Sequence, residues 1–335
     1  MPSLWKSLAD LQVRIDDHSV QRRELVVSPQ FTRVTTTVVL HSDDETGQGE
    51  DVTYTADDHA EFPHPMIAGT WTLHDFSRRL DELELFDAEP EMGASRDYRR
   101  WAFESAALDL ALRQAGRSFA EAVGREYRPV RFVASTRADI EPYRGFDPEL
   151  EFKLDAEEGW DDALVARLAA TDRVRVVDLK AYYRGTSVDL DPDPGLYRRV
   201  AEGLPDVVLE DAWLEGECGE ALAGAHDRLS FDAPIHSWKD VTELAVEPKW
   251  LNIKPSRFGT VERLLECIEE CEARGIRMYG GGQFELGPGR RQIQRIASLF
   301  YADGPNDVAP SEYNDGPARE GLTRSPLPPP SGAGF

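Results

Sequence analysis

The fold is decided by four short stretches, VRVVDLK (174–180), DVVLED (206–211), RLSFDA (228–233) and WLNIKP (250–255). Each stretch is a run of mostly apolar residues followed by a charged one. A buried strand of a parallel sheet has this pattern, because both of its faces are covered and only its end meets water. The four stretches therefore predict consecutive parallel strands with polar groups at one edge of the sheet.

The same pattern continues on both sides of these stretches. Further runs are VRFVAS (130–135), LEFKL (150–154), IRMYGG (276–281) and, more weakly, NDVAP (306–310). Segments with helical spacing separate the runs, for example WDDALVARLAA (160–170) and TVERLLECIEECEARG (260–275). Eight strands that alternate with helices predict an α/β protein in which residues 129–310 close into a (β/α) barrel.

The residues before the barrel have a different pattern. LQVRIDD (11–17) and RVTTTVVLHS (33–42) alternate apolar and polar residues, as half-buried strands do, and an Ala/Leu-rich helix is expected over 97–116. We therefore expect a separate α+β domain over 1–128. Residues 311–335 are rich in Pro and Gly, so we expect this segment to pack on the N-terminal domain or to be partly mobile.

Composition limits the class of partner. The chain of 335 residues has 62 acidic and 38 basic residues and a net charge of −24, which would repel phosphate backbones and anionic lipids. We therefore expect neither nucleic acid nor a membrane as a partner. No apolar run approaches the roughly 18 residues of a membrane helix, and the first residues lack the apolar segment of a signal peptide. A cytoplasmic protein is the expectation, with Cys218, Cys267 and Cys271 as reduced structural thiols.

Three carboxylates stand at the ends of consecutive predicted strands. Asp178, Glu210 and Asp232 are separated by 210 − 178 = 32 and 232 − 210 = 22 residues, about one strand–helix unit each. Any one of them alone is explained equally well as a helix cap. Neighbouring strands of a barrel would bring all three together, and carboxylates that converge repel one another unless a cation lies between them. We therefore predict a site for a hard divalent cation, Mg²⁺, with Mn²⁺ as the alternative.

Lysine is rare in this chain, with only six residues, yet three of the six fall in predicted strands or at their ends. These three are Lys153, Lys180 and Lys254. A lysine beside a carboxylate site can act as a base or form a salt bridge with one of the carboxylates. Both roles are open for Lys254, which follows the apolar run WLNI (250–253).

With these residues in view, the chain resembles the enolase superfamily, in particular its mandelate racemase and muconate lactonizing branch. The turn GQGED (47–51) resembles the G-x-G-E turn of the family's capping domain, and YGGGQFELGPGRRQIQ (279–294) resembles its seventh-strand region. The resemblance implies a barrel of the enolase type with an α+β capping domain. It also implies that Asp178, Glu210 and Asp232 bind Mg²⁺ and that Lys254 is the sixth-strand lysine.

The chain departs from the family pattern on two strands. The family carries Lys-x-Lys on the second strand, where this chain has EFKLD (151–155). Either Lys153 is the working lysine and Glu151 replaces the first one, or Lys153 is the first and Asp155 takes the catalytic position. On the third strand the family often has Asp-x-Asn, whereas this chain has Lys180 two residues after Asp178. Lys180 is therefore also a candidate for proton transfer or for pairing with a carboxylate.

The resemblance implies a reaction in which a proton α to the carboxylate of a small substrate is removed and the metal stabilises the enediolate. Racemisation or epimerisation, with Lys153 and Lys254 on opposite faces of the substrate carbon, and dehydration or cycloelimination both remain open. A rival interpretation is a metal-binding pseudoenzyme without turnover. By position, residues 16–32 and 51–64 would be the capping-domain loops that close over the substrate, and a homo-oligomer is compatible with the family.

Overall fold

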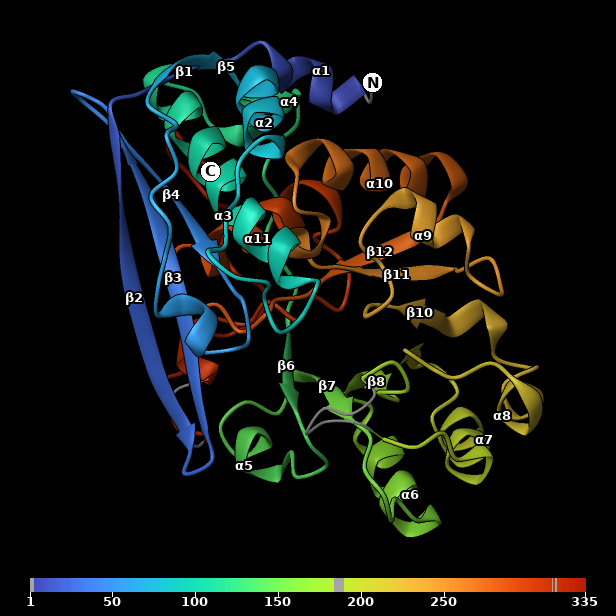
Figure 1. Ribbon diagram of the computed structural model, residues 1–335. Helices are drawn as coiled ribbons and strands as arrows, with labels where there is room; N and C mark the ends of the chain where they lie inside the picture. Colours follow the sequence, from blue (N-terminus) through green and yellow to red (C-terminus); the bar gives the residue numbers. More distant parts are fainter. Residues whose placement is uncertain (1–2, 184–189, 315, 317) are drawn as a thin grey trace.

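The computed structural model of the chain describes residues 3–183, 190–314, 316 and 318–335. Among these residues, a parallel sheet of seven strands runs in chain order from β6 to β12 and curls into most of a barrel (Figure 1). The strands are β6 (Val133–Thr136), β7 (Glu151–Asp155), β8 (Val174–Asp178), β9 (Val208–Glu210), β10 (Leu229–Phe231), β11 (Trp250–Ile253) and β12 (Arg277–Gly280). Each contains one of the apolar runs of the sequence, so the predicted α/β barrel is confirmed.

The eighth predicted strand, NDVAP, is reduced to two isolated bridges. Asn306 pairs with Phe132, the residue before β6, and Asp307 pairs with Gly281, the residue after β12. Both bridges are parallel. The Val133 amide donates to the Asn306 carbonyl at 2.8 Å, and the Asp307 amide donates to the Gly280 carbonyl at 2.8 Å. Residues 306–307 thus join the first strand to the last and occupy the eighth position of the ring.

Helices alternate with the barrel strands. They are α5 (Glu141–Arg144), α6 (Asp162–Thr171), α7 (Pro194–Gly203), α8 (Gly216–Ala221), α9 (Trp238–Thr242), α10 (Val261–Arg274) and α11 (Gly289–Phe300). Local sequence sets their limits, as α10 shows. The Thr260 side chain accepts the Arg263 amide at its start, and Gly275 ends it with φ +67, a left-handed conformation that glycine adopts without strain.

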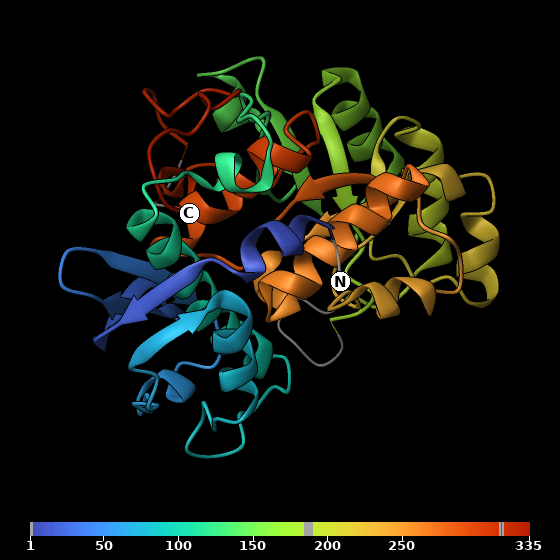
Figure 2. The same cartoon turned by 90° about the horizontal axis from the view of Figure 1, so that it is seen from above.

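The N-terminal part carries two antiparallel sheets, which Figure 2 shows at one side of the barrel. One sheet pairs β1 (Gln12–Ile15) with β5 (Gly69–Thr72), and the other has the order β2 (Asp17–Ser28), β3 (Phe31–His41), β4 (Thr46–Asp51). The helices are α1 (Ser3–Ala9), α2 (Leu73–Asp81), α3 (Ser95–Gln114) and α4 (Phe119–Val123). The segment 16–32, expected to be a loop over the barrel, is wrongly predicted. It forms strand β2 and the start of β3, because eleven residue pairs join it to β3.

Strand β4 packs directly against helix α3. A Cβ atom added at Gly47 would lie 2.2 Å from the Ala106 carbonyl oxygen, and one at Gly49 would lie 2.0 Å from that of Ala102. No side chain fits in this space, so the two glycines allow backbone-to-backbone contact between sheet and helix. This contact explains the small residues of GQGED, which the structure shows as part of strand β4 and not as the expected turn, and it fixes Glu50 and Asp51 beside them.

Two buried carboxylates of the N-terminal part contact the first turns of barrel helices. Glu50 accepts the amides of Leu286, Gly287 and Gly289, at 2.7, 2.9 and 2.9 Å, where α11 begins. Glu104, on α3, accepts the Val261 amide at 3.3 Å, where α10 begins. The first amides of a helix have no partner within the helix, and its N-terminus favours negative charge. These contacts hold the N-terminal part on the barrel.

The C-terminal segment returns to the N-terminal helices. The Phe335 ring lies 5.0 Å from the ring of Phe119 and 6.2 Å from that of Trp101, between centroids. Its amide donates to Asp109 on α3 at 2.8 Å. The boundaries 1–128, 129–310 and 311–335 remain predictions. None of the helices among the described residues is long and apolar enough to cross a membrane.

Candidate metal centre

The three predicted carboxylates lie at the C-terminal ends of neighbouring strands. Asp178 ends β8 and pairs in register with Glu210, which ends β9, and Glu210 pairs with Ser230 of β10. Asp232 follows β10 by one residue. All three side chains are fully buried. The parallel register therefore brings groups that are far apart in the sequence to one end of the barrel.

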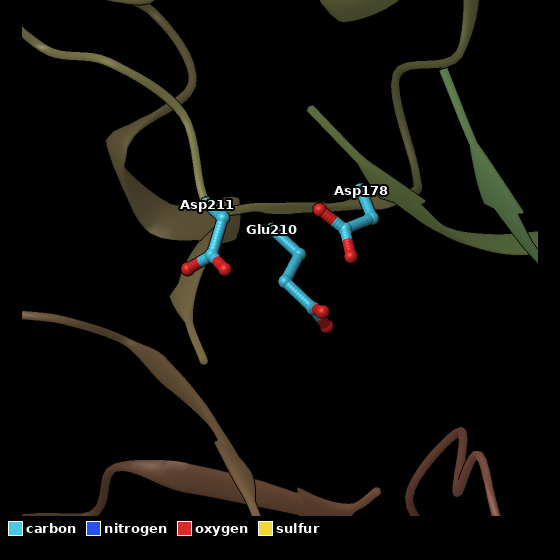
Figure 3. A group of neighbouring side chains, drawn as sticks. All are labelled: Asp178, Glu210 and Asp211. Atoms are coloured by element: carbon cyan, nitrogen blue, oxygen red, sulfur yellow. The ribbon is translucent and has the colours of Figure 1, made fainter. Parts of the chain in front are cut away.

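The tightest acidic cluster contains one residue that the sequence did not predict. Oxygens of Asp178, Glu210 and Asp211 lie within 4.8 Å of one another, and Figure 3 shows these three side chains beside each other. Asp232 does not belong to that closest set. The only signal for Asp211 is the second acid of the pair Glu-Asp in VVLED, and alternation along a strand would have pointed it away from Glu210.

Asp211 positions Asp232. Its two carboxylate oxygens accept the amides of Asp232 and Ala233, at 2.8 and 3.0 Å. Its backbone φ of +52 is in the left-handed region, which takes the chain out of strand geometry and explains why alternation fails here. Asp211 thus joins the end of β9 to the end of β10. We regard it as a support for Asp232, since backbone donors already engage both of its oxygens.

Asp232 has one engaged oxygen and one free one. Oδ2 accepts the Lys254 ammonium at 2.7 Å and the Tyr183 hydroxyl at 2.9 Å, and it lies 3.4 Å from Arg257 Nη2. Oδ1 is buried and has no hydrogen-bond partner among the described residues. A buried anionic oxygen without a partner is costly, and a bound cation would satisfy it.

Lys153 extends from β7 into the same cluster. Its ammonium forms a short contact with Glu210 and lies 3.5 Å from Asp178 Oδ2. Only 3% of the side chain is exposed. Glu210 is further held by the Tyr279 hydroxyl and by the Asn252 amide, the latter at 3.1 Å.

Lys254 reaches the cluster from the end of β11. Its side chain passes Gly281, where an added Cβ would lie 2.9 Å from the Lys254 Cε atom and 2.5 Å from the Asn252 side-chain oxygen. Any larger residue at position 281 would therefore displace the lysine. The expected salt bridge of Lys254 is present, with Asp232 as its partner.

Lys180 lies at the rim of the cluster. Its ammonium contacts Asp178 Oδ2 at 2.6 Å and Asp155 Oδ1 at 2.9 Å. Its backbone has φ +55, which turns the side chain back over Asp178, and its own amide donates to Asp178 Oδ1 at 3.0 Å. Of the two roles considered for Lys180, pairing with a carboxylate is present in the structure.

The two alternatives for the second strand separate in space. Glu151 lies at the N-terminal end of β7, where it accepts Arg131 at 2.7 Å and Arg175 at 2.6 Å. It lines a cavity of about 450 Å³ with Arg128 and Asp303, and no predicted metal ligand lines that cavity. Asp155, in register with Asp178, instead pairs with Lys180. Of the residues in EFKLD, Lys153 is the one that contacts Glu210.

The pKa values in the cluster diverge. Burial raises the pKa of Glu210 to about 8 and that of Asp211 to about 7, and the neighbouring carboxylates add to both shifts. Burial acts the same way on Asp178, but Lys180 and Lys153 outweigh it and lower its pKa to about 2. Arg257 and Lys254 likewise hold the pKa of Asp232 well below its usual range. The positive charges of Lys180, Lys254 and Arg257 therefore lie beside Asp178 and Asp232.

The residues present fit a divalent cation. All candidate ligands are carboxylate oxygens, which hard ions such as Mg²⁺ prefer. The buried Oδ1 of Asp232 has no hydrogen-bond partner among the described residues, so it is an oxygen that a cation would satisfy. The buried acidic cluster can thus hold a divalent metal.

Several contacts at this end of the barrel were missed from the sequence. Arg257, two residues beyond the motif NIKP, donates to the Asp232 carbonyl at 2.7 Å and is buried. From the N-terminal part, the hydroxyls of Tyr54 and Tyr98 lie at 3.1 Å from the side chain of Gln283. His236 Nδ1 lies 3.1 Å from the Arg257 carbonyl oxygen and 3.6 Å from Asp97 Oδ2.

Comparison with known families gives a match over most of the chain. Two models match, the N-terminal domain of a domain of unknown function (DUF8230) over residues 6–122 and the C-terminal domain of the same family over 126–315. The chain belongs to this family. It is also 29% identical over 228 residues to an N-succinylamino acid racemase of an Amycolatopsis species. That match covers 63% of this chain and 60% of the racemase.

Solved structures with the same fold belong to the enolase superfamily. Muconate cycloisomerase from Pseudomonas fluorescens has a TM-score of 0.67 and 18% identity, with 96% of this chain and 92% of that one covered. An enolase-superfamily member from Enterococcus faecalis V583 has a TM-score of 0.62 and 19% identity, with 89% and 86% covered. The barrel of the enolase type with an α+β capping domain is therefore confirmed as the fold. The resemblance to the enolase superfamily is confirmed as well.

Proposed function

We propose that this chain is an enzyme that uses Mg²⁺ to remove a proton α to the carboxylate of a small substrate, and that Asp178, Glu210 and Asp232 bind the metal. The observation that carries the proposal is the placement of two lysines around the buried carboxylates. Lys153 comes from β7 and Lys254 from the end of β11. With 306–307 in the eighth position, β7 and β11 are four places apart in a ring of eight, so the two lysines approach from opposite sides.

The proposed roles follow from these positions. When bound, Mg²⁺ would supply positive charge beside the substrate carboxylate and so lower the energy of the charge that develops when the α-proton leaves. Lys254 takes the proton on one face of the α-carbon. Lys153, on the other face, returns a proton in racemisation or epimerisation, or stabilises negative charge in an elimination. Lys180 lies at the rim and is the third candidate for proton transfer.

The similar proteins support this class of reaction. The relative from Amycolatopsis is named a racemase, and the structure from Pseudomonas fluorescens is named a cycloisomerase. Each name states a carboxylic acid as the substrate, an N-succinylamino acid and muconate. We therefore propose N-acylamino acids and the lactones of unsaturated dicarboxylates, such as muconolactone, as the first substrates to test, because their α-carbon is saturated and carries a removable proton. Mn²⁺ is the alternative metal, and the proposed location is the cytoplasm.

The test is exchange of the α-proton in D₂O. The protein with Mg²⁺ is incubated with a panel of these carboxylates, and loss of the α-proton signal is followed by NMR. We expect exchange with at least one acid, and its loss when EDTA removes the metal. Optical rotation and product analysis then distinguish racemisation from elimination.

A metal-binding pseudoenzyme is the second candidate, and one contact favours it. The Lys153 ammonium is engaged by Glu210 and Asp178, which leaves it less free to meet a substrate. This candidate predicts that Mg²⁺ binds, as measured by isothermal titration calorimetry, while no carboxylate in the panel exchanges its proton. Absence of metal binding would contradict both candidates.

A further inference from the structure

The ammonium in closest contact with Asp178 is that of Lys180, two residues further along the chain. It lies 2.6 Å from Asp178 Oδ2, an oxygen of a proposed metal ligand, whereas the Lys153 ammonium lies 3.5 Å from the same atom. A magnesium ion would lie at about 2.1 Å from a carboxylate ligand. Two cations on one carboxylate oxygen at these distances repel each other in a buried site, so each weakens the binding of the other.

Lys180 has a second partner outside the cluster. Asp155 Oδ1 lies 2.9 Å from the same ammonium, and the Asp155 side chain is 33% exposed whereas that of Asp178 is fully buried. The Tyr183 ring also faces the ammonium, with its centroid 4.8 Å away. A small rotation of the lysine would keep the contact with Asp155 and release Asp178.

Lys153 lacks such an exit. It is more deeply buried, and beyond the cluster its next carboxylate is Asp307, at 4.0 Å. The left-handed backbone of Lys180, a conformation that residues other than glycine rarely adopt, directs its side chain over Asp178. Of the two lysines, Lys180 is therefore the one with a partly exposed second partner close by.

We propose that Lys180 is a tethered competitor of the divalent metal at Asp178, and that Asp155 holds its ammonium in the metal-loaded protein. The proposal rests on the proposed metal site and adds how metal affinity is set there. Metal entry moves Lys180 from a position shared by Asp178 and Asp155 to one on Asp155 alone. The affinity of the site is therefore lower than its carboxylates alone would give.

The experiment is a double-mutant cycle on metal affinity, read by calorimetry with Mg²⁺ and by the electron paramagnetic resonance signal of free Mn²⁺. Lys180→Met removes the competitor, and we expect the Kd for Mg²⁺ to fall about 10-fold, which is about 1.4 kcal/mol. Asp155→Asn removes the alternative partner, and we expect the Kd to rise several-fold. In the double variant the Asp155→Asn effect should vanish, because it acts through Lys180.

Additive effects of the two substitutions would overturn the proposal, because simple through-space charge predicts additivity. An unchanged or higher Kd in Lys180→Met would also overturn it. Lys180→Gln, which keeps a hydrogen-bond donor for Asp178, is a second variant in case the methionine disturbs folding, as checked by circular dichroism. Lys239→Met, at an exposed lysine, is the charge-matched control.

The outcomes separate this inference from the proposed function. If the native protein and Lys180→Met both fail to bind Mg²⁺ and Mn²⁺, the metal site itself is wrong and the inference falls with it. If the native protein binds metal and the variants bind it equally well, only the role of Lys180 is wrong.

Discussion

Buried carboxylates occur in two regions of this molecule, and different partners neutralise them. At the C-terminal end of the barrel, Asp178 and Asp232 face the ammonium groups of lysines. At the contact between the N-terminal part and the barrel, Glu50 faces three backbone amides, and Glu104 faces an amide and the side chains of Ser77 and Arg100. Lysine side chains can move away, whereas the amides of a helix end are fixed. This difference supports the proposal that a cation can replace a lysine in the first region, the exchanging region, whereas the second, the holding region, fixes the N-terminal part on the barrel.

The largest expected effect comes from removing Lys254, the proposed base in the exchanging region. Lys254→Met should lower the rate of α-proton exchange by about 10³-fold, because it removes the proposed base on that face. The rate is measured by NMR in D₂O with a substrate that the native protein exchanges. Lys249→Met, at an exposed lysine just before β11, is the matched control and should keep the native rate. Equal rates in both variants would remove Lys254 from the mechanism.

The next effect concerns metal affinity. Glu210→Gln keeps the shape of the side chain but removes a charged ligand, so the Kd for Mg²⁺ should rise at least about 100-fold. Glu50→Gln, an identical change in the holding region, should leave the Kd unchanged. Calorimetric titration of both variants gives the comparison. A similar loss of affinity in the two would mean that metal binding reports general damage to the fold.

A stability measurement tests the holding region. Glu50→Ala leaves three amides at the start of α11 without their acceptor, and we expect the free energy of unfolding to fall by about 2 kcal/mol. Urea unfolding followed by circular dichroism measures it. The same truncation at Glu84, an exposed residue, should change stability by less than about 0.5 kcal/mol.

The smallest effect is a pH dependence. Burial raises the pKa of Glu104 above 4.5, only partly offset by Arg100 and Ser77, so the folded protein holds this proton more tightly than the unfolded chain does. The contribution to stability is then complete below about pH 4.5 and is lost as pH rises through the folded-state pKa. The stability of the native protein relative to Glu104→Gln should therefore decrease as pH rises above about 4.5 in urea unfolding.

A substitution of opposite sign checks this reasoning. Hydrogen bonds from Ser118 lower the pKa of the exposed Glu121, so its contribution to stability is lost as pH falls and not as it rises. Stability relative to Glu121→Gln should then increase with pH in the acid range. The same slope for both variants would contradict the assignment for Glu104.

Much of the barrel could be predicted because its signals are local. Each strand of the parallel sheet is a short apolar run, and Asp178, Glu210 and Asp232 follow directly after such runs, so reading along the chain places them at strand ends. Strand β2 was missed because it lacks such a local signal. Its side chains are largely exposed and lack regular alternation, and only its pairing with β3 makes it a strand.

The sequence by itself determined the order of the barrel's strands and helices, the excess of acidic charge and the three carboxylates at successive strand ends. Tertiary structure alone decided which groups meet. The left-handed backbone at Asp211 and Lys180 overrides strand alternation, and Glu151 lies at the far end of the strand that carries Lys153. The physical reason is that strand ends follow from local hydrophobicity. The partner of a charged side chain depends instead on register and backbone direction between segments that are distant in sequence.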